Sequence, residues 1–310
     1  MILKDNKKNN TLITIVGPTA IGKTALSIQL ANYYNADIIS CDSRQFYKEM
    51  TIGTAVPDTE ELASAKHHFI QDRSVFEDYN VGSFERDALQ KLAELFQENP
   101  VQIMVGGSGL YVDAVLRGLD YFPEVAPEIR ENLTIQLQEK GIETLQEQLK
   151  ELDLETYNTI ALDNPHRIMR ALEICIGSNT PYSTFKNKPK APRKFTSIKI
   201  GLTADREIIY ERINQRVDRM MVDGLLEEAN KLYPNKNLNA LQTVGYRELF
   251  SYFDGDFTKE FAIAEIKKNT RRFAKRQGTW FRKDEQILWF DYQRNITEII
   301  DLISDKINAF

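Results

Sequence analysis

Short apolar runs separated by turn residues recur along the chain and predict buried strands. They are rich in β-branched residues and occupy residues 11–16, 38–41, 101–105 and 198–202. Such runs are typical of strands that are covered on both faces, as in a parallel sheet. Helical spacing dominates between the runs, so the pattern predicts an α/β fold built on a parallel sheet.

Helices are predicted where apolar residues recur every three or four positions. One stripe follows Ser83, the expected N-cap, and ends before Pro100. Its apolar members are Phe84, Ala88, Leu92 and Leu95. The last long helix is expected from about Thr258 to Arg282.

The pattern changes between residues 122 and 185, where strand signals vanish and apolar residues recur only at helical intervals. Ile168 and Leu172 are among the predicted core residues of this segment. A basic, proline-rich stretch, residues 186–194, follows it. We therefore expect an all-helical subdomain at 122–185, inserted into an α/β core of residues 1–121 and 186–310.

Length and composition are those of an ordinary globular protein. The 310 residues allow one large domain and a smaller one, and 42% of them are apolar and 27% charged. No apolar run reaches the ~18 residues of a membrane span, and the polar segment 1–10 has no signal-peptide core. We expect a monomeric cytoplasmic protein that contacts no membrane, with a frayed tail at residues 1–10. Only Cys41 and Cys175 are present, which argues against a disulfide framework or a structural zinc site.

The first apolar run leads into a glycine-rich turn with the spacing of a phosphate-binding loop. This loop consists of Gly17, Pro18, Thr19, Ala20, Ile21, Gly22, Lys23 and Thr24. The glycines let successive N–H groups point at an anion, Lys23 adds positive charge, and Thr24 offers its hydroxyl to Mg²⁺. The flanking strand and helix favour this interpretation over an ordinary turn. The pattern predicts a site for a di- or triphosphate and magnesium, with Thr24 as the metal ligand.

Two further turns are expected to meet this loop at the carboxyl edge of the sheet. Asp42 follows the second apolar run, and Ser108 lies in a glycine-rich turn after the third. Asp42 could instead cap a following helix, and the second glycine turn could serve only tight helix packing. His67 and His68 lack the neighbours of a metal site, so we expect both to be structural.

Two segments combine cations in a way that favours RNA. Arg167 and Arg170 share one face of a predicted helix, with a solvated face as the alternative. Between Lys267 and Lys283 the chain holds no acidic residue, although the net charge of the whole chain is −5 and a solvated helix usually mixes charges. Three aromatic residues interleave with these cations: Phe273, Trp280 and Phe281. This combination is expected where phosphates are neutralised and bases stack.

Seven short motifs, in this order, resemble those of the tRNA dimethylallyltransferase (isopentenyltransferase) family. They are GPTAIGKT, DSRQFYKEMTIGTA, HHFI, GGSGLY, NPHRIMRALE, TVGYRE and AKRQGTWFR, and they extend from Gly17 to Arg282. The resemblance implies a P-loop core with an inserted helical domain. It also implies Mg²⁺-dependent transfer of a dimethylallyl group from its diphosphate to N6 of the adenosine 3′-adjacent to the anticodon of tRNA.

The resemblance also implies roles for residues at matching positions. The diphosphate would bind residues 19–24, and the target adenosine would meet Asp42, Ser43, Arg44 and Gln45. Other tRNA contacts would be Ser108, Arg130, His166, Arg167, Ile168, Met169, Arg170, Gln242, Thr243, Val244, Gly245, Tyr246 and Arg247. The chain departs from the family pattern at Ile21, Val56, Gln71, Ser108 and His166. The change at Val56, where a lysine is common, bears on substrate affinity.

The chemistry expected from the residues agrees with the resemblance. Adenine N6 is a poor nucleophile, so Asp42 is expected to accept its proton, with Thr19 and Ser108 as further catalytic residues. Lys23, the loop and Arg216 would stabilise the charge of the departing diphosphate. Two other classes stay open: a P-loop kinase, which would not need the basic aromatic helix, and an RNA-binding regulator, which would not need Asp42.

Overall fold

The computed structural model describes residues 9–309, which form two compact units. The first unit comprises the chain up to Arg117 and again from Arg193, and the second is the segment Gly118–Pro192. Residues 122–185, the expected insertion, lie within this second segment. Most of segment 1–10, for which we expect a frayed tail, lies outside the described residues. None of the described helices combines the length and apolarity that a membrane crossing requires.

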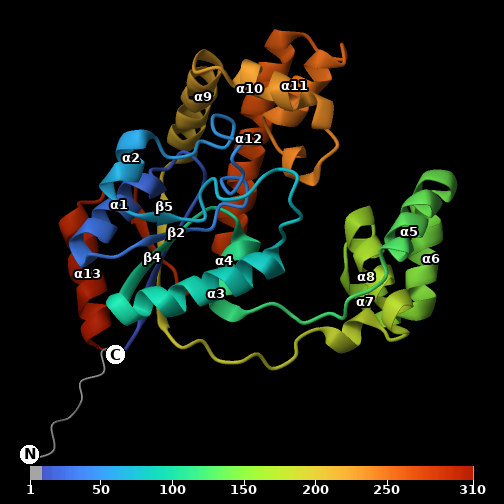
Figure 1. The fold of residues 1–310 in the computed structure, drawn as a ribbon, viewed down its shortest axis with the longest axis horizontal. Coiled ribbons are helices and arrows are strands. Elements are labelled where there is room, and N and C mark those ends of the chain that lie inside the picture. Colours follow the sequence, from blue (N-terminus) through green and yellow to red (C-terminus); the bar gives the residue numbers. More distant parts are fainter. Residues whose placement is uncertain (1–8, 310) are drawn as a thin grey trace, which may run out of the picture. The chain divides into compact units, whose positions relative to one another are not determined.

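A parallel sheet forms the centre of the first unit (Figure 1). Its strands are β1 (Thr11–Val16), β2 (Ile38–Ser40), β3 (His67–His68), β4 (Val101–Val105), β5 (Thr196–Thr203) and β6 (Leu288–Asp291). Within residues 9–309 the six strands have the order β3-β2-β4-β1-β5-β6, and every neighbouring pair is parallel. The predicted α/β fold is confirmed, while β3 and β6 have no counterpart among the predicted strands.

Helices cover both faces of this sheet, because side chains alternate between the faces along each strand. On one face, α1 (Lys23–Tyr34) and α13 (Ile296–Asn308) pack with Ile13 and Ile15 of β1. On the other face, Leu12 and Val16 pack with α3 (Val81–Glu98), α4 (Gly109–Arg117) and the end of α12 (Lys259–Phe281). The short α2 (Thr59–Ser64) lies in the connection from β2 to β3.

The start of α3 differs from the prediction. The predicted stripe from Phe84 to Leu95 is buried, but the N-cap is Asn80 rather than Ser83. The Asn80 side chain accepts the N–H groups of Gly82 and Ser83 at 3.0 and 3.1 Å. Asparagine and serine are both good N-caps, so the sequence alone did not distinguish the two positions.

β1 and β4 are neighbours in the sheet, and the helices that follow them lie on opposite faces. β1 leads to α1 on one face, and β4 leads to α4 on the other. A crevice therefore opens between the carboxyl ends of these two strands, where open parallel sheets bind their ligands. The loop of residues 17–22 and the turn of residues 106–108 begin at this crevice.

A helical lobe completes the first unit. It consists of α9 (Arg206–Val222), α10 (Leu225–Leu232), η2 (Tyr233–Asn235), η3 (Asn239–Leu241), α11 (Tyr246–Phe253) and α12. Tyr246, Leu249 and Ile266 lie in its core, together with Tyr47 and Met50 from the connection after β2. The segment that follows Asp42 is therefore held by the lobe. The predicted long helix at 258–282 is confirmed as α12, with Thr258 as its N-cap.

All regular elements of the second unit, Gly118–Pro192, are helices, and its two ends, residues 118–126 and 186–192, are not helical. Its elements are α5 (Pro127–Lys140), α6 (Ile142–Leu152), α7 (Leu154–Thr159), α8 (Pro165–Ser178) and η1 (Tyr182–Phe185). Ile168 and Leu172 of α8 are fully buried against Leu133, Leu145 and Leu149, as the helical spacing predicts. α8 begins at Pro165, whose fixed φ suits the first helical position.

Candidate active site

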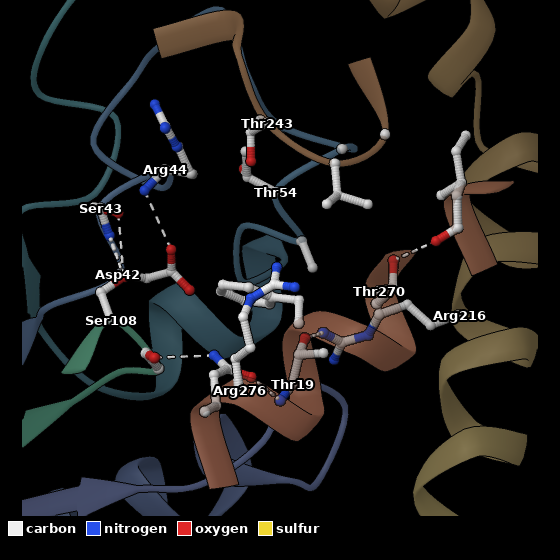
Figure 2. Close-up of a pocket in the computed structure, with 18 of the residues that line it drawn as sticks. Thr19, Asp42, Ser43, Arg44, Thr54, Ser108, Arg216, Thr243, Thr270 and Arg276 are labelled. Carbon is white, nitrogen blue, oxygen red and sulfur yellow. Dashed lines mark hydrogen bonds between the residues drawn. The ribbon is translucent and has the colours of Figure 1, made fainter. Parts of the chain in front are cut away.

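One cavity of about 570 Å³ lies at the carboxyl edge of the sheet in the first unit. The loops after β1, β2 and β4 contribute Thr19, Asp42 and Ser108 (Figure 2). α9 and α12 contribute Arg216 and Arg276, and residues 53–55 and 242–245 also line the cavity. The structure therefore brings together three turns that the sequence predicted to meet at this edge.

The loop after β1 has the backbone that its glycines allow. Gly17 and Gly22 have φ of 143° and 108°, and a Cβ on Gly17 would lie 2.7 Å from the carbonyl oxygen of Leu202. Ala20 also has a positive φ, 64°, which is uncommon for a residue with a side chain. The Lys23 ammonium donates to the carbonyls of Gly17 and Pro18 at 3.0 and 2.8 Å. The lysine is thus held against the loop that it is expected to serve.

Three cations converge on this loop. Arg216 donates to the Thr19 hydroxyl at 3.3 Å, and Arg212 donates to the Ala20 carbonyl at 2.7 Å. Among residues 9–309, none of the ion pairs includes Lys23, Arg212 or Arg216. Because buried charges are normally paired, this cluster is suited to an anionic ligand.

Burial sets the electrostatics of these cations. Burial lowers the pKa of Lys23 to about 8, while the Asp42 carboxylate opposes the shift. Burial and then repulsion by Arg212 lower the pKa of Arg216, and Asp42 again opposes the shift. Near neutral pH both groups stay largely charged, and a bound polyanion would raise both pKa values again. Asp42 is therefore close enough to interact electrostatically with the cations at the loop after β1.

Gln277, on α12, joins the two glycine turns and was missed by the sequence analysis. Its Oε1 accepts the Thr19 N–H at 2.9 Å, and its Nε2 donates to the Gly107 carbonyl at 3.0 Å. The expectation that successive loop N–H groups all face an anion is therefore corrected for Thr19. A Cβ on Gly107 would lie 2.1 Å from this Nε2, so a side chain at residue 107 would push the Gln277 amide out of its present position. A glutamine within a basic stretch carries no local signal of such a role.

Asp42 does not cap a helix, because the residues that follow it form turns. Its Oδ1 accepts the N–H of Arg44 at 3.2 Å, and the carboxylate lines the cavity. The Ser43 N–H donates to the Ser108 hydroxyl at 3.2 Å, and the two hydroxyls lie 3.1 Å apart. The turn after β4 therefore holds the turn after β2 through hydrogen bonds. The second glycine turn thus has a role in the cavity besides tight helix packing.

Arg44 and Gln45 have their polar groups engaged within the protein. Arg44 donates to the carbonyls of Asn239 and Ala240 at 3.1 and 2.9 Å. Gln45 donates to the carbonyls of Thr54 and Ala55 at 3.2 and 2.8 Å. Both side chains thereby fix the surroundings of the cavity.

The turn before α11 divides between cavity and core. Gln242, Thr243, Val244, Gly245 and Arg247 line the cavity. Tyr246 is fully buried and donates to Glu228 at 2.6 Å. The expectation that the Tyr246 side chain contacts tRNA is therefore corrected, because it presents no surface to a ligand.

α12 presents cations and aromatic residues to solvent and to the cavity. Arg272, Lys275 and Arg276 are exposed, whereas Lys267 pairs with Asp218 at 2.6 Å. Among the aromatic residues, Phe273 and Trp280 are exposed and line the cavity. Phe281 is buried against the sheet, so its expected place on the basic surface is corrected.

The predicted tRNA contacts of the second unit are split by the helical period of α8. His166, Arg167 and Arg170 are exposed, whereas Ile168 and Met169 are 0% and 5% exposed. The expectation that these two apolar side chains contact RNA is therefore corrected. Arg130 and Arg170 donate to the buried Glu173 carboxylate at 3.0 and 3.4 Å.

Both side chains of the histidine pair are hydrogen-bonded within the protein. His68 lies 2.7 Å from the Asp37 carboxylate at the edge of the sheet, and His67 bonds to the Ala65 carbonyl. Within residues 9–309, no group of three or more His, Cys, Asp or Glu side chains is arranged to hold a metal ion by itself.

The fold and the cavity define a P-loop α/β protein in which a glycine-rich loop, a strand-end carboxylate and a basic aromatic helix share one site. The model of the IPP transferase family matches residues 45–284. The chain belongs to the tRNA dimethylallyltransferase (IPP transferase) family, which confirms the resemblance of the seven motifs.

Individual relatives match nearly the whole chain. A tRNA dimethylallyltransferase of Flavobacterium psychrophilum is 64% identical over 303 residues, covering 96% of this chain and 99% of the relative. One of Christiangramia forsetii is 60% identical, covering 97% and 100%. The full-length tRNA isopentenylpyrophosphate transferase from Bacillus halodurans has a TM-score of 0.73 at 36% identity, with 97% of each chain covered. A eukaryotic dimethylallyltransferase acting on tRNA shares the fold, with a TM-score of 0.82 at 23% identity over 97% of this chain and 80% of its own.

Proposed function

We propose that this protein transfers a dimethylallyl group from dimethylallyl diphosphate to N6 of the adenosine 3′-adjacent to the anticodon of tRNA. The relatives named above, 64% and 60% identical to this chain, are called tRNA dimethylallyltransferases. The observation that carries the proposal is one cavity that brings a partly buried cation cluster at the loop after β1 together with the Asp42 carboxylate at the end of β2.

The donor diphosphate binds at the loop of residues 17–24 in this proposal. Lys23 and Arg216 neutralise its oxygens, and the N–H groups that face the crevice add hydrogen bonds. Both cations stabilise the charge that grows on the diphosphate as the carbon–oxygen bond breaks. Their burial supports this role, because electrostatic stabilisation is stronger where water is excluded.

Magnesium fits this site as part of a magnesium diphosphate. Mg²⁺ prefers hard oxygen ligands and usually keeps waters and substrate phosphates around it, so a cage of protein carboxylates is not needed. The Thr24 hydroxyl is an oxygen donor of this kind, and Thr24 is partly exposed at the start of α1. When bound, the ion would neutralise diphosphate charge.

Asp42 acts as the general base. The adenine N6 attacks the allylic carbon, the bond from that carbon to the diphosphate oxygen breaks, and the proton leaves N6 for the Asp42 carboxylate. At the donor end, the Thr19 hydroxyl accepts a hydrogen bond from Arg216 and so helps to hold this cation in place. At the acceptor end, the Ser108 hydroxyl lies within hydrogen-bond distance of the Ser43 hydroxyl and so helps to hold the turn that carries Asp42. The walls of the cavity would limit the access of water to the electron-poor allyl group.

The tRNA presents an adenosine flipped from its stack, because a stacked base could not reach a carboxylate inside a cavity. Ser43 and residues 242–245 would surround the base, and exposed cations of α12 would bind phosphates. Arg130, His166, Arg167 and Arg170 would contact tRNA from the second unit. The enzyme acts as a monomer in this proposal. A tRNA substrate is met in the cytoplasm, where we propose the enzyme acts.

The test is incubation of the purified protein with Mg²⁺, labelled dimethylallyl diphosphate and an anticodon stem-loop with adenosine at the target position. Label is expected in the RNA that carries the target adenosine. No label is expected in a control stem-loop that carries guanosine at the same position. Phosphoryl transfer from ATP without RNA would instead favour a kinase. RNA binding without any label transfer would favour a regulator.

A further inference from the structure

The carboxylate of Glu228, on α10, binds the backbone of a segment that leads into one wall of the cavity. Its Oε2 accepts the N–H groups of Thr51 and Ile52 at 3.0 and 2.8 Å. Its Oε1 accepts the N–H of Gly53 at 2.9 Å and the hydroxyl of Tyr246 at 2.6 Å. Only an ionised carboxylate has two oxygens that each accept two bonds and donate none, so it suits four converging donors.

The segment approaches the lobe so closely that glycine is required at residue 53. A Cβ on Gly53 would lie 2.6 Å from ring atoms of Tyr246, which is fully buried and cannot move aside freely. Burial, followed by the charge of Glu228, raises the pKa of Tyr246, so its hydroxyl stays protonated and donates. Residues 51–53, Tyr246 and Glu228 thus form one connected unit, here called the Glu228 clamp.

The Glu228 clamp is joined to the cavity through the next residues of the chain. Residues 53–55 line the cavity, and Gln45 donates to two carbonyl oxygens of this wall. Gln45 follows directly on the turn that carries Asp42. In Figure 2, Thr54 lies away from Thr19 and its arginine partner. The wall therefore belongs to the end of the cavity at which the target base would sit.

We propose that Glu228 is a positioning residue for the acceptor base: through residues 51–53 it fixes the wall of residues 53–55 against which the adenosine is oriented. This inference rests on the proposed function, because that function assigns the acceptor to this end of the cavity. The donor end is assigned to other groups, Lys23 and Arg216, and within residues 9–309 no side-chain hydrogen bond joins either of them to the Glu228 clamp. Loss of the clamp should therefore affect the two substrates unequally.

Glu228→Gln tests the inference, because it keeps the side chain's size but turns an NH₂ group toward the N–H donors. Glu227→Gln is the matched control, since Glu227 is the preceding residue of α10 and is exposed. We expect Glu228→Gln to lower kcat/KM for the stem-loop RNA by roughly 10- to 100-fold, as expected for a misplaced reactant. The Kd of Glu228→Gln for dimethylallyl diphosphate should equal that of the unmodified protein. The control Glu227→Gln should have the same kinetic constants as the unmodified protein.

Gly53→Ala provides a second approach from the side of the loop, because it leaves the carboxylate intact and separates residue 53 from Tyr246. It should produce the same selective loss for RNA. Hydrogen exchange at the amides of residues 51–53 should be faster in both variants. Faster exchange with unchanged RNA kinetics would overturn the inference, and so would equal losses for donor and RNA, which indicate a general structural role.

The proposed function can fail separately from the Glu228 clamp. If the unmodified protein transferred no label to RNA, the proposed function would fail and the positioning role with it. Slow amide exchange at residues 51–53 that is lost in Glu228→Gln would even then show that the carboxylate holds this segment.

Discussion

Asp42 owes its place in the cavity to one strand end and one hydrogen bond. β2 ends two residues before it, and the Arg44 N–H binds its Oδ1, so that the carboxylate faces the cavity instead of capping a helix. Lys23 and Arg216 lie near enough to interact with it electrostatically. A carboxylate in this position can accept a proton from a bound amine while it remains attracted to the donor end.

Replacement of Asp42 by asparagine should separate catalysis from donor binding. Asparagine keeps an acceptor for the Arg44 N–H but cannot take the N6 proton. We expect Asp42→Asn to lower turnover by about 10² or more, because general bases contribute on that scale. Binding of dimethylallyl diphosphate, measured by calorimetry, should change little. Asp305→Asn, an exposed change on α13, is the control, and normal turnover in Asp42→Asn would rule Asp42 out as the base.

Within the second unit, α7 and η1 are joined by a single buried carboxylate. Asp153 accepts the N–H and hydroxyl of Thr156 at 2.9 and 2.6 Å, and those of Ser183 at 2.7 and 3.0 Å. Burial by itself would raise the pKa of Asp153, but the four hydrogen bonds outweigh it and hold the pKa below its usual value. Asp153 therefore caps α7 and fixes the segment that follows α8.

The lowered pKa of Asp153 predicts a pH-dependent contribution to stability. The contribution is fully present above the unfolded-state pKa of about 4 and is lost as the pH falls through the lower folded-state pKa. Asp153→Asn should lower the free energy of unfolding by about 2 kcal/mol near neutral pH, the scale of hydrogen bonds to a charged group. Urea unfolding should be measured from about pH 7 to about pH 3.5. The difference in the free energy of unfolding between Asp153→Asn and the unmodified protein should become smaller as the pH falls.

The exposed Asp163→Asn of the same unit is the control for that series. It should leave the free energy of unfolding unchanged within about 0.5 kcal/mol, as surface substitutions usually do. A difference between Asp153→Asn and the unmodified protein that stayed constant with pH would show that ionisation of Asp153 does not contribute.

On the scale of the whole molecule, the proposed function assigns the diphosphate and the RNA phosphates to different parts of the first unit. The diphosphate end is built from the loop after β1 and from α9, whereas RNA phosphates would meet the exposed face of α12. Arg276 lines the cavity, so its replacement would affect the binding of both the diphosphate and the RNA. Arg272 and Lys275 are exposed and do not line it, which makes them the better probes of RNA binding alone.

The division predicts opposite effects of two sets of substitutions. Arg272→Ala with Lys275→Ala should weaken stem-loop binding and flatten its log–log salt dependence by up to about one unit per lost phosphate contact. The affinity for dimethylallyl diphosphate should hardly change. Lys23→Ala should weaken the diphosphate and spare RNA. Binding isotherms for both ligands across a salt series measure this, and an unchanged RNA salt slope in the double variant would make this face of α12 a solvated surface.

The amino-acid sequence alone determined those features that depend on neighbours along the chain. The apolar runs of β1, β2 and β4 were read correctly because burial on both faces requires consecutive apolar residues. The loop of residues 17–24 was recognisable because its glycines and Lys23 act at fixed spacings. Helical spacing also predicted the buried Ile168, which the family resemblance alone would have assigned to RNA.

Tertiary structure decided the partners of polar groups that lie far apart in the chain. Thr19 and Gln277 are separated by 258 positions, and Glu228 meets residues 51–53 from more than 170 positions away. No local period encodes such pairs, because they depend on how strands and helices pack. The same holds for Tyr246 and Phe281, which were predicted from the sequence to contact RNA. The ring of Tyr246 is buried in the core of the helical lobe, and that of Phe281 is buried against one face of the sheet.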